Sequence, residues 1–179
     1  MASTVAVRLT YEDYLELPND GKRYEIIDGE LYVNPAPVPL HQIIIRQLLR
    51  RIQDHLDTHG GGEAIGAPID VVLGRETVVQ PDVIVVLRER VSIIGPTNVN
   101  GAPDLVIEVL SQRTRSYDET AKRKVYEQAG VKEYWIVDPE RTEIRVHRGG
   151  DVAISHVGGT ITSPLMPGFV LELRYVFRA

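Results

Sequence analysis

The sequence contains no cysteine, which excludes disulfides, thiolate metal ligands and a cysteine nucleophile. It also lacks any apolar run close to the roughly 20 residues that cross a bilayer. Its start, MASTVAVRLT, has neither the basic segment nor the long apolar stretch of a secretory signal. These absences predict a protein without a membrane span, located in the cytoplasm.

An excess of basic residues is also missing. Twenty Lys and Arg against 25 Asp and Glu give a net charge of −5, which argues against binding of a polyanion by the whole surface. A local surplus lies between Arg113 and Lys124, where five basic residues accompany two acidic ones, a difference of 5 − 2 = +3. Such a surplus beside carboxylates suits a site that holds both phosphate and metal.

Length and composition are those of an ordinary globular protein. The chain has 179 residues, of which 43% are hydrophobic and 25% charged, enough to bury a core without crosslinks. We therefore predict one domain over residues 1–179, with residues 1–8 as a flexible tail.

The order of the expected elements indicates the fold class. Capping and helical spacing predict helices over Tyr11–Leu17, His41–His59 and Tyr117–Ala129. Apolar and β-branched runs predict strands at Arg23–Ile27, Glu30–Val33, Ile69–Leu73, Val78–Leu87, Leu105–Leu110, Glu133–Val137, Glu143–Arg148, Val152–Val157 and Val170–Val176. The pattern predicts an α/β (α+β) fold: a mixed β-sheet flanked by helices, with added antiparallel β-hairpins.

Two carboxylates lie inside these apolar runs. Asp82 interrupts Val79–Val86 and Glu108 interrupts Leu105–Leu110. An ionised carboxylate in a buried strand is costly unless it is paired, protonated or bound to a metal. Adjacent strands lie about 4.8 Å apart, so both oxygens could reach one cation, and hard oxygen ligands suit Mg²⁺ or Mn²⁺. The alternatives are pairing with a buried arginine, or a strand end in water.

Asp104 precedes Glu108 in the same run, also after a proline. Four residues along a strand span about 13 Å, too far for both carboxylates to bind one ion. We therefore expect Asp104 to mark the entry to the strand.

Several ordered segments resemble a known family. They are Gln80–Val83, Ile107–Ser111, a lysine in the following helix, Tyr126–Pro139 and the N-terminal Arg23–Leu31. Together they resemble the Uma-type restriction endonuclease family of the PD-(D/E)XK nuclease superfamily, over most of the chain.

The resemblance implies a restriction-endonuclease-like core with a four-stranded mixed sheet, and a metal-dependent endonuclease that hydrolyses phosphodiester bonds of DNA. It implies Asp82, Glu108 and the carbonyl of Val109 as ligands of Mg²⁺ or Mn²⁺, with Lys122 assisting. The superfamily pattern expects a lysine two residues after the glutamate, where this chain has Leu110. Restriction enzymes cut two strands, so the resemblance also favours a homodimer.

Lys122 shares a helical stripe with Asp118 and Tyr126, which would let it lean toward the sheet; the alternative is a solvated lysine paired with Asp118. Lys124 is the second candidate. Glu25 resembles the acidic residue that the superfamily supplies from its first element, as a catalytic residue or second metal ligand; the alternative is an exposed strand glutamate.

The remaining polar and aromatic residues favour structural interpretations. His41 could approach a phosphate, but a solvated histidine at the helix start is the simpler expectation. His55 and His59 have the spacing of a zinc pair without a third ligand, which favours the surface. Asp138 is expected in a turn before Pro139. Tyr134 and Trp135 are expected to lie in the core and not to form a platform on which bases stack.

Two other classes of function stay open: a catalytically silent nucleic-acid-binding or dimerisation module, and a phosphodiesterase acting on small molecules.

Overall fold

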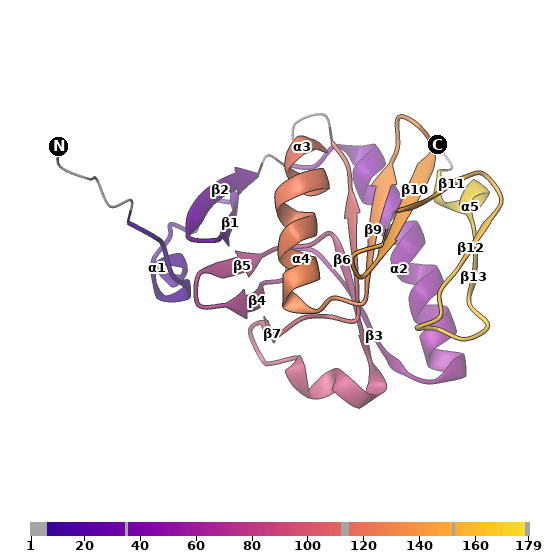
Figure 1. The fold of residues 1–179 in the computed structure, drawn as a ribbon, viewed down its shortest axis with the longest axis horizontal. Coiled ribbons are helices and arrows are strands. Elements are labelled where there is room, and N and C mark those ends of the chain that lie inside the picture. Colours follow the sequence, from indigo (N-terminus) through magenta and orange to yellow (C-terminus); the bar gives the residue numbers. More distant parts are fainter. Residues whose placement is uncertain (1–6, 35, 112–114, 152, 178–179) are drawn as a thin grey trace.

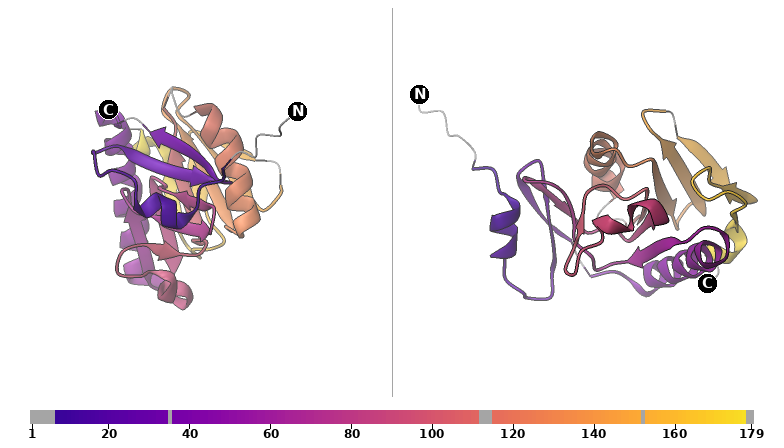
Figure 2. Two further views of the ribbon diagram at one scale, coloured as in Figure 1. Left: turned by 90° about the vertical axis from the view of Figure 1, so that its left-hand side faces the viewer. Right: turned by 90° about the horizontal axis from the view of Figure 1, so that it is seen from below.

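The structure is a computed structural model that describes residues 7–34, 36–111, 115–151 and 153–177. Its main layer is a six-stranded mixed sheet with a long helix on each face (Figure 1; Figure 2). A second sheet lies beside it toward the N-terminal end. The arrangement confirms the predicted mixed sheet flanked by helices.

The six-stranded sheet has the order β11-β10-β9-β8-β6-β3. Its strands are β3 (Gly62–Gly66), β6 (Val83–Leu87), β8 (Leu105–Val109), β9 (Glu133–Asp138), β10 (Glu143–Arg148) and β11 (Ile154–Val157). Only β8 and β9 run parallel; every other neighbouring pair is antiparallel. The β10–β11 hairpin thus adds two antiparallel strands to the four that the family resemblance implies.

Successive side chains along each strand point to opposite faces of the sheet, so the molecule has one hydrophobic core on each face. Side chains of one parity, such as Val83, Ile107 and Trp135, pack with helix α2 (Pro39–His59). Side chains of the other parity, such as Ile84, pack with helix α4 (Arg123–Ala129). Both faces are covered, which is why these strands are nearly continuous apolar runs.

The helix on the second face is not a uniform α-helix. It begins as α3 (Arg115–Tyr117), passes through a π-helical turn η2 (Asp118–Lys122) and continues as α4. The spacing of the sequence predicts one regular helix here, so the π-turn is a departure from that prediction. Such turns insert one residue and change which side chains face the sheet.

The second sheet has the order β2-β1-β5-β4-β7 and is flanked by the short helix α1 (Tyr11–Leu15) (Figure 1). Its strands are β1 (Arg23–Ile27), β2 (Glu30–Asn34), β4 (Val71–Gly74), β5 (Thr77–Val79) and β7 (Val99–Asn100). Asp28 and Gly29 join β1 to β2 with φ angles of 50° and 78°. These positive angles confirm the predicted two-residue turn.

Two predicted elements are wrong, and one strand is absent from the prediction. The run Val78–Leu87 is two strands in different sheets, because Pro81 has no N–H for a ladder and the chain crosses between the sheets at that point. Strand β3 was not predicted, since its two glycines resemble a loop. At the C-terminus β13 (Val170–Glu172) pairs with β12 (Thr160–Thr162) and is followed by the helix α5 (Leu173–Val176), not by more strand.

The remaining element is a 3-10 turn η1 (Arg88–Ile93) between β6 and β7. The predicted tail falls mostly on residues 1–6, outside the described residues, whereas Arg8 forms an ion pair with Glu76. Among the described residues, no helix has both the length and the apolar character to cross a membrane.

Candidate active site

The two carboxylates singled out from the sequence lie on neighbouring strands. Strands β6 and β8 pair antiparallel with Val83 opposite Ile107. Extending that register by one residue places Asp82 opposite Glu108, and the Val109 N–H donates to the Asp82 Oδ2 at 2.9 Å. Both carboxylates are buried and line the same cavity.

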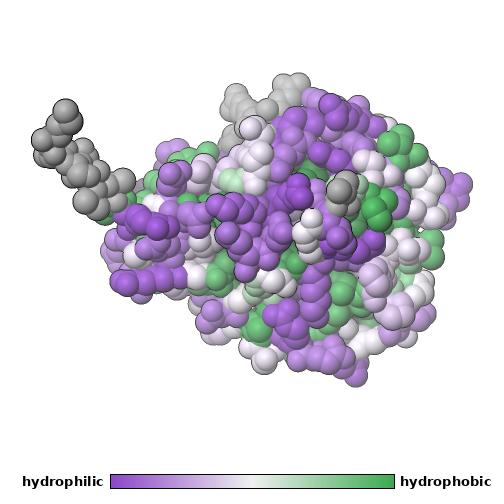
Figure 3. Space-filling model, viewed as in Figure 1, coloured by the Kyte–Doolittle hydropathy of each residue, from purple (hydrophilic) through white to green (hydrophobic). Residues whose placement is uncertain are grey.

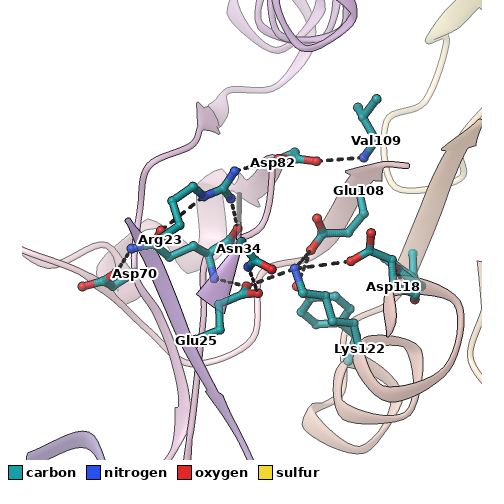
Figure 4. Close-up of polar contacts among 12 residues, drawn as sticks. Arg23, Glu25, Asn34, Asp70, Asp82, Glu108, Val109, Asp118 and Lys122 are labelled. Atoms are coloured by element: carbon teal, nitrogen blue, oxygen red, sulfur yellow. Dashed lines mark hydrogen bonds and ion pairs between the residues drawn. The ribbon is translucent and has the colours of Figure 1, made fainter. Parts of the chain in front are cut away.

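Glu108 points toward the helix with the π-turn (Figure 4). Its Oε1 accepts hydrogen bonds from the Lys122 Nζ at 2.9 Å and from the Tyr126 hydroxyl at 2.8 Å. The same ammonium lies 3.6 Å from the Asp118 Oδ1. Lys122 is therefore buried and leans toward the sheet, whereas Lys124 is exposed.

Glu25 reaches this cluster from the other sheet. Its Oε1 lies 3.0 Å from the Lys122 Nζ and accepts the Gln80 N–H at 2.6 Å. Its Oε2 accepts a hydrogen bond from the Asn34 amide. Glu25 is fully buried, so the alternative of an exposed strand glutamate is wrong, and it does not line the cavity. Its oxygens hold Lys122 and the ends of two strands.

Asp82 is held by a histidine and an arginine. The His41 Nε2 lies 3.1 Å from its Oδ2, and the Arg23 Nη1 lies 3.4 Å from its Oδ1. Arg23 also donates to the carbonyl of Gln80. Arg23 belongs to β1 and His41 to α2, so two other elements hold the segment in which the chain passes from one sheet to the other.

His41 differs from its sequence expectation. The N-terminal turn of α2 places it against the sheet, where only 7% of its surface is exposed, rather than in solvent. Its Nδ1 has no hydrogen-bond partner among the described residues, and the side chain lines the cavity. No local sequence signal indicates this burial, because it depends on the packing of α2 on β6 and β8.

The cavity has a volume of about 560 Å³. Its lining contains most of the polar residues just described and several aliphatic side chains. The charged and histidine lining residues are Arg23, His41, Asp82, Glu108, Arg115, Asp118, Lys122 and Glu140. Sequence reasoning missed Arg23 and left Asp118 as a helix neighbour; their contribution depends on contacts between distant elements.

Burial and mutual charge shift the ionisation of these groups. Burial raises the pKa of Glu108 well above its usual range, and Asp82, Asp118 and Glu25 add to the rise against the opposing charge of Lys122. Burial disfavours the Lys122 ammonium, but Glu108, Glu25 and Asp118 outweigh it and raise its pKa. Lys122 is thus a charged lysine, and Glu108 is the carboxylate that is hardest to ionise.

Asp82 behaves differently from Glu108. Burial opposes its ionisation, yet the His41 hydrogen bond and the charges of His41 and Arg23 lower the pKa of Asp82 below its ordinary value. Among the described residues, the four buried carboxylates Glu25, Asp82, Glu108 and Asp118 form ion pairs with two permanently charged side chains, Arg23 and Lys122.

The crowding of these carboxylates bears on whether a metal could bind here. A divalent cation would offset their mutual repulsion, and the donors are hard oxygens of the kind that Mg²⁺ prefers. Among the described residues no group of three acidic or histidine side chains could hold a metal ion. The residues present fit a metal only at a site with two side-chain ligands, because Asp82 and Glu108 lie side by side on neighbouring strands and line the cavity, so main-chain and water oxygens would have to complete the set.

Other predicted residues are placed elsewhere. Asp104 is buried at the entry to β8, where it pairs with Arg90 and Lys132, as expected. Asp138 accepts the N–H groups of Glu140 and Arg141, which confirms the turn.

Arg115 belongs to the basic segment and pairs with Asp138 at 2.6 Å, while Arg113 lies outside the described residues. The rings of His55 and His59 stack 4.4 Å apart, with neither ring fully buried. Trp135 lies in the core. It is therefore no base-stacking platform.

Comparison with known proteins gives a consistent picture. Residues 11–174 match the family Uma2, described as "Putative restriction endonuclease". An uncharacterized protein of Synechocystis sp. is 29% identical over 150 residues, which are 80% of this chain and 76% of that protein.

A solved structure shows the same architecture. It is described as the crystal structure of a putative nuclease from Anabaena variabilis, and its TM-score is 0.82 at 20% sequence identity. The match covers 94% of this chain and 97% of that one. At this level of identity the likeness establishes the fold and leaves substrate and site residues to be argued from the chain itself.

Proposed function

The chain belongs to the Uma2 family of putative restriction endonucleases, and on that premise we propose that it is a Mg²⁺-dependent endonuclease that hydrolyses phosphodiester bonds of DNA. The observation that carries the proposal is the cluster of buried carboxylates, of which Asp82, Glu108 and Asp118 line a cavity together with Lys122. Crowded buried carboxylates are costly for stability alone, and they are useful where a cation and a phosphate must be held together.

Asp82 and Glu108 would hold the cation, with the Val109 carbonyl as a third ligand. When bound, Mg²⁺ supplies positive charge to a phosphate and lowers the pKa of water. Mn²⁺ takes the same ligands. The Asp82 carboxylate is kept ionised and oriented by His41 and Arg23, both within 3.4 Å.

Lys122 would offset the negative charge that develops on the phosphate in the transition state. It suits this role because it lines the cavity and stays charged. Glu25 acts through Lys122: it lies behind the ammonium at 3.0 Å and fixes its position. Lys122 thus takes the place of the lysine that the superfamily pattern expects at Leu110.

The chain's partner is DNA, and a homodimer in the cytoplasm is part of the same proposal. Restriction enzymes cut two strands, and a symmetric homodimer would present one site to each strand. Size-exclusion chromatography with light scattering measures the mass directly, and a monomer with undiminished double-strand cutting would contradict the dimer.

The test is a cleavage assay with supercoiled plasmid and single-stranded DNA in Mg²⁺, Mn²⁺ or EDTA. The wild-type protein should cut only with metal, and Glu108→Ala and Asp82→Ala should not cut. Thermal unfolding of each variant verifies that it folds. Full metal-dependent cutting by Asp82→Ala would refute the assignment. Binding of DNA without cutting would favour a silent module, and hydrolysis of small diesters alone would favour a phosphodiesterase.

A further inference from the structure

One wall of the cavity is an exposed apolar segment. Residues 36–40, Ala-Pro-Val-Pro-Leu, are all exposed, and Ala36, Pro37, Val38 and Leu40 line the cavity. Val38 is 60% exposed and Leu40 is 41% exposed. The face of the molecule drawn in Figure 3 is mainly hydrophilic, with scattered apolar groups. An exposed apolar strip that lines a charged cavity indicates contact with an apolar group of a ligand.

The basic residues of the same cavity are already engaged. Each of the four has a carboxylate partner: Arg23 with Asp82 at 3.4 Å, His41 with Asp82 at 3.1 Å, Arg115 with Asp138 at 2.6 Å and Lys122 with Glu108 at 2.9 Å. Affinity for a duplex comes mainly from free cations that neutralise phosphates and release counterions. The net charge of −5 argues against many such free cations on this chain.

We propose that the cavity takes one unpaired nucleotide of a single-stranded polynucleotide, with the base against the 36–40 wall and the adjacent phosphate toward Asp82 and Glu108. This inference rests on the proposed function and names its substrate class. The volume of about 560 Å³ lies within the range of pockets that enclose small ligands. In a duplex the base faces are stacked on one another, so only an unpaired base can lie against this wall.

The experiment compares four substrates under one condition: a single-stranded oligonucleotide, its perfect duplex, the same duplex with one bulged nucleotide, and bis(p-nitrophenyl) phosphate. We expect kcat/KM on the single strand and at the bulge to exceed that on the perfect duplex by at least about tenfold. Equal cutting of the perfect duplex would overturn the inference and leave the nuclease proposal standing.

A double variant removes the apolar wall without adding charge. Val38→Thr with Leu40→Asn keeps side-chain size, and threonine is a favourable residue at the N-cap position that Val38 occupies. We expect KM for the single strand to rise about tenfold with kcat unchanged, the usual effect of a lost apolar contact. The matched control is Ile154→Asn with Val157→Thr on β11, which are exposed but do not line the cavity; it should leave KM unchanged.

Binding separates this inference from the proposed activity when it is measured with Ca²⁺ in place of Mg²⁺, because a hard divalent cation offsets the carboxylates of Asp82 and Glu108 that would otherwise repel a phosphate. Fluorescence anisotropy of a labelled single strand should show wall-dependent binding that weakens by only about sevenfold between 50 and 200 mM salt, the loss for about two phosphate contacts. If no substrate is cut but this binding is seen, the activity fails and the inference stands. The inference would be overturned if the wild-type protein did not bind the single strand. It would also be overturned if the double variant bound the single strand and hydrolysed the small diester as the wild type does.

Discussion

Two buried glutamates on neighbouring strands have opposite surroundings. Glu133 on β9 accepts the Arg148 Nε at 2.8 Å on one oxygen, and the Trp135 Nε1 and Ser163 hydroxyl on the other. It has one cation of its own and does not line the cavity. Glu108 on β8 shares one lysine with two other carboxylates and does line it. We therefore assign Glu133, which has an arginine of its own, to the stability of the fold, and Glu108, which shares its lysine, to the proposed reaction.

Replacing each glutamate by glutamine should give the largest difference between a role in cleavage and a role in stability. Glu108→Gln should reduce metal-dependent cleavage by at least about 100-fold. Its unfolding temperature should not fall, because Lys122 keeps Glu25 and Asp118 as partners. Cleavage rates and thermal unfolding on the same preparations measure both effects. A variant that loses stability but cuts normally would show that Glu108 resembles Glu133.

Removing the shared cation should damage both properties. Lys122→Met leaves three buried carboxylates without their common ammonium, so we expect a loss of about 3–5 kcal/mol in the free energy of unfolding, together with loss of cleavage. Urea unfolding gives the free energy. Lys124→Met, at an exposed position two residues further along the helix, is the control and should change it by less than about 0.5 kcal/mol.

Glu133→Gln is the complementary change. It replaces a charged acceptor of Arg148 by a neutral one, and we expect a loss of about 2 kcal/mol in stability. The cleavage rate of the folded protein should be unchanged, measured well below the unfolding temperature. A fall in cleavage without a fall in stability would break the comparison.

The smallest effect concerns acid stability and lies outside both clusters. Burial, with Arg123 and Arg145 nearby, lowers the pKa of His147 to about 4. The unfolded chain binds a proton near pH 6.5, about the ordinary histidine value, before the folded protein does. The free energy of unfolding should therefore fall as the pH drops from 6.5 to 4.

His147→Phe tests this directly, because phenylalanine keeps the ring beside Tyr134 but cannot bind a proton. We expect a shallower loss of unfolding temperature below pH 6.5 than in the wild type. Parallel curves for the two proteins would assign the acid sensitivity to other groups.

Short-range chemistry made much of the fold predictable. The Asp28-Gly29 turn and the apolar strands follow from local backbone preferences and periodicity. The adjacency of Asp82 and Glu108 follows from the cost of leaving carboxylates unpartnered in apolar strands. The role of Lys122 came from the family resemblance and stays a prediction, although the structure brings it to Glu108.

The missing parts depend on distant contacts. His41 looked like a solvated helix start and is buried because α2 packs on the sheet. The π-turn has no sequence signature, and the crossover at Pro81 divides one apolar run between two sheets. Glu25 comes close to Lys122 only when both sheets are assembled.

The most direct test of the account is a calorimetric titration of the purified protein with Mn²⁺, beside Asp82→Asn and Glu133→Gln. The account predicts one Mn²⁺ bound per chain by the wild type and by Glu133→Gln, and none by Asp82→Asn. Equal binding by all three proteins, or no binding by the folded wild type, would contradict it.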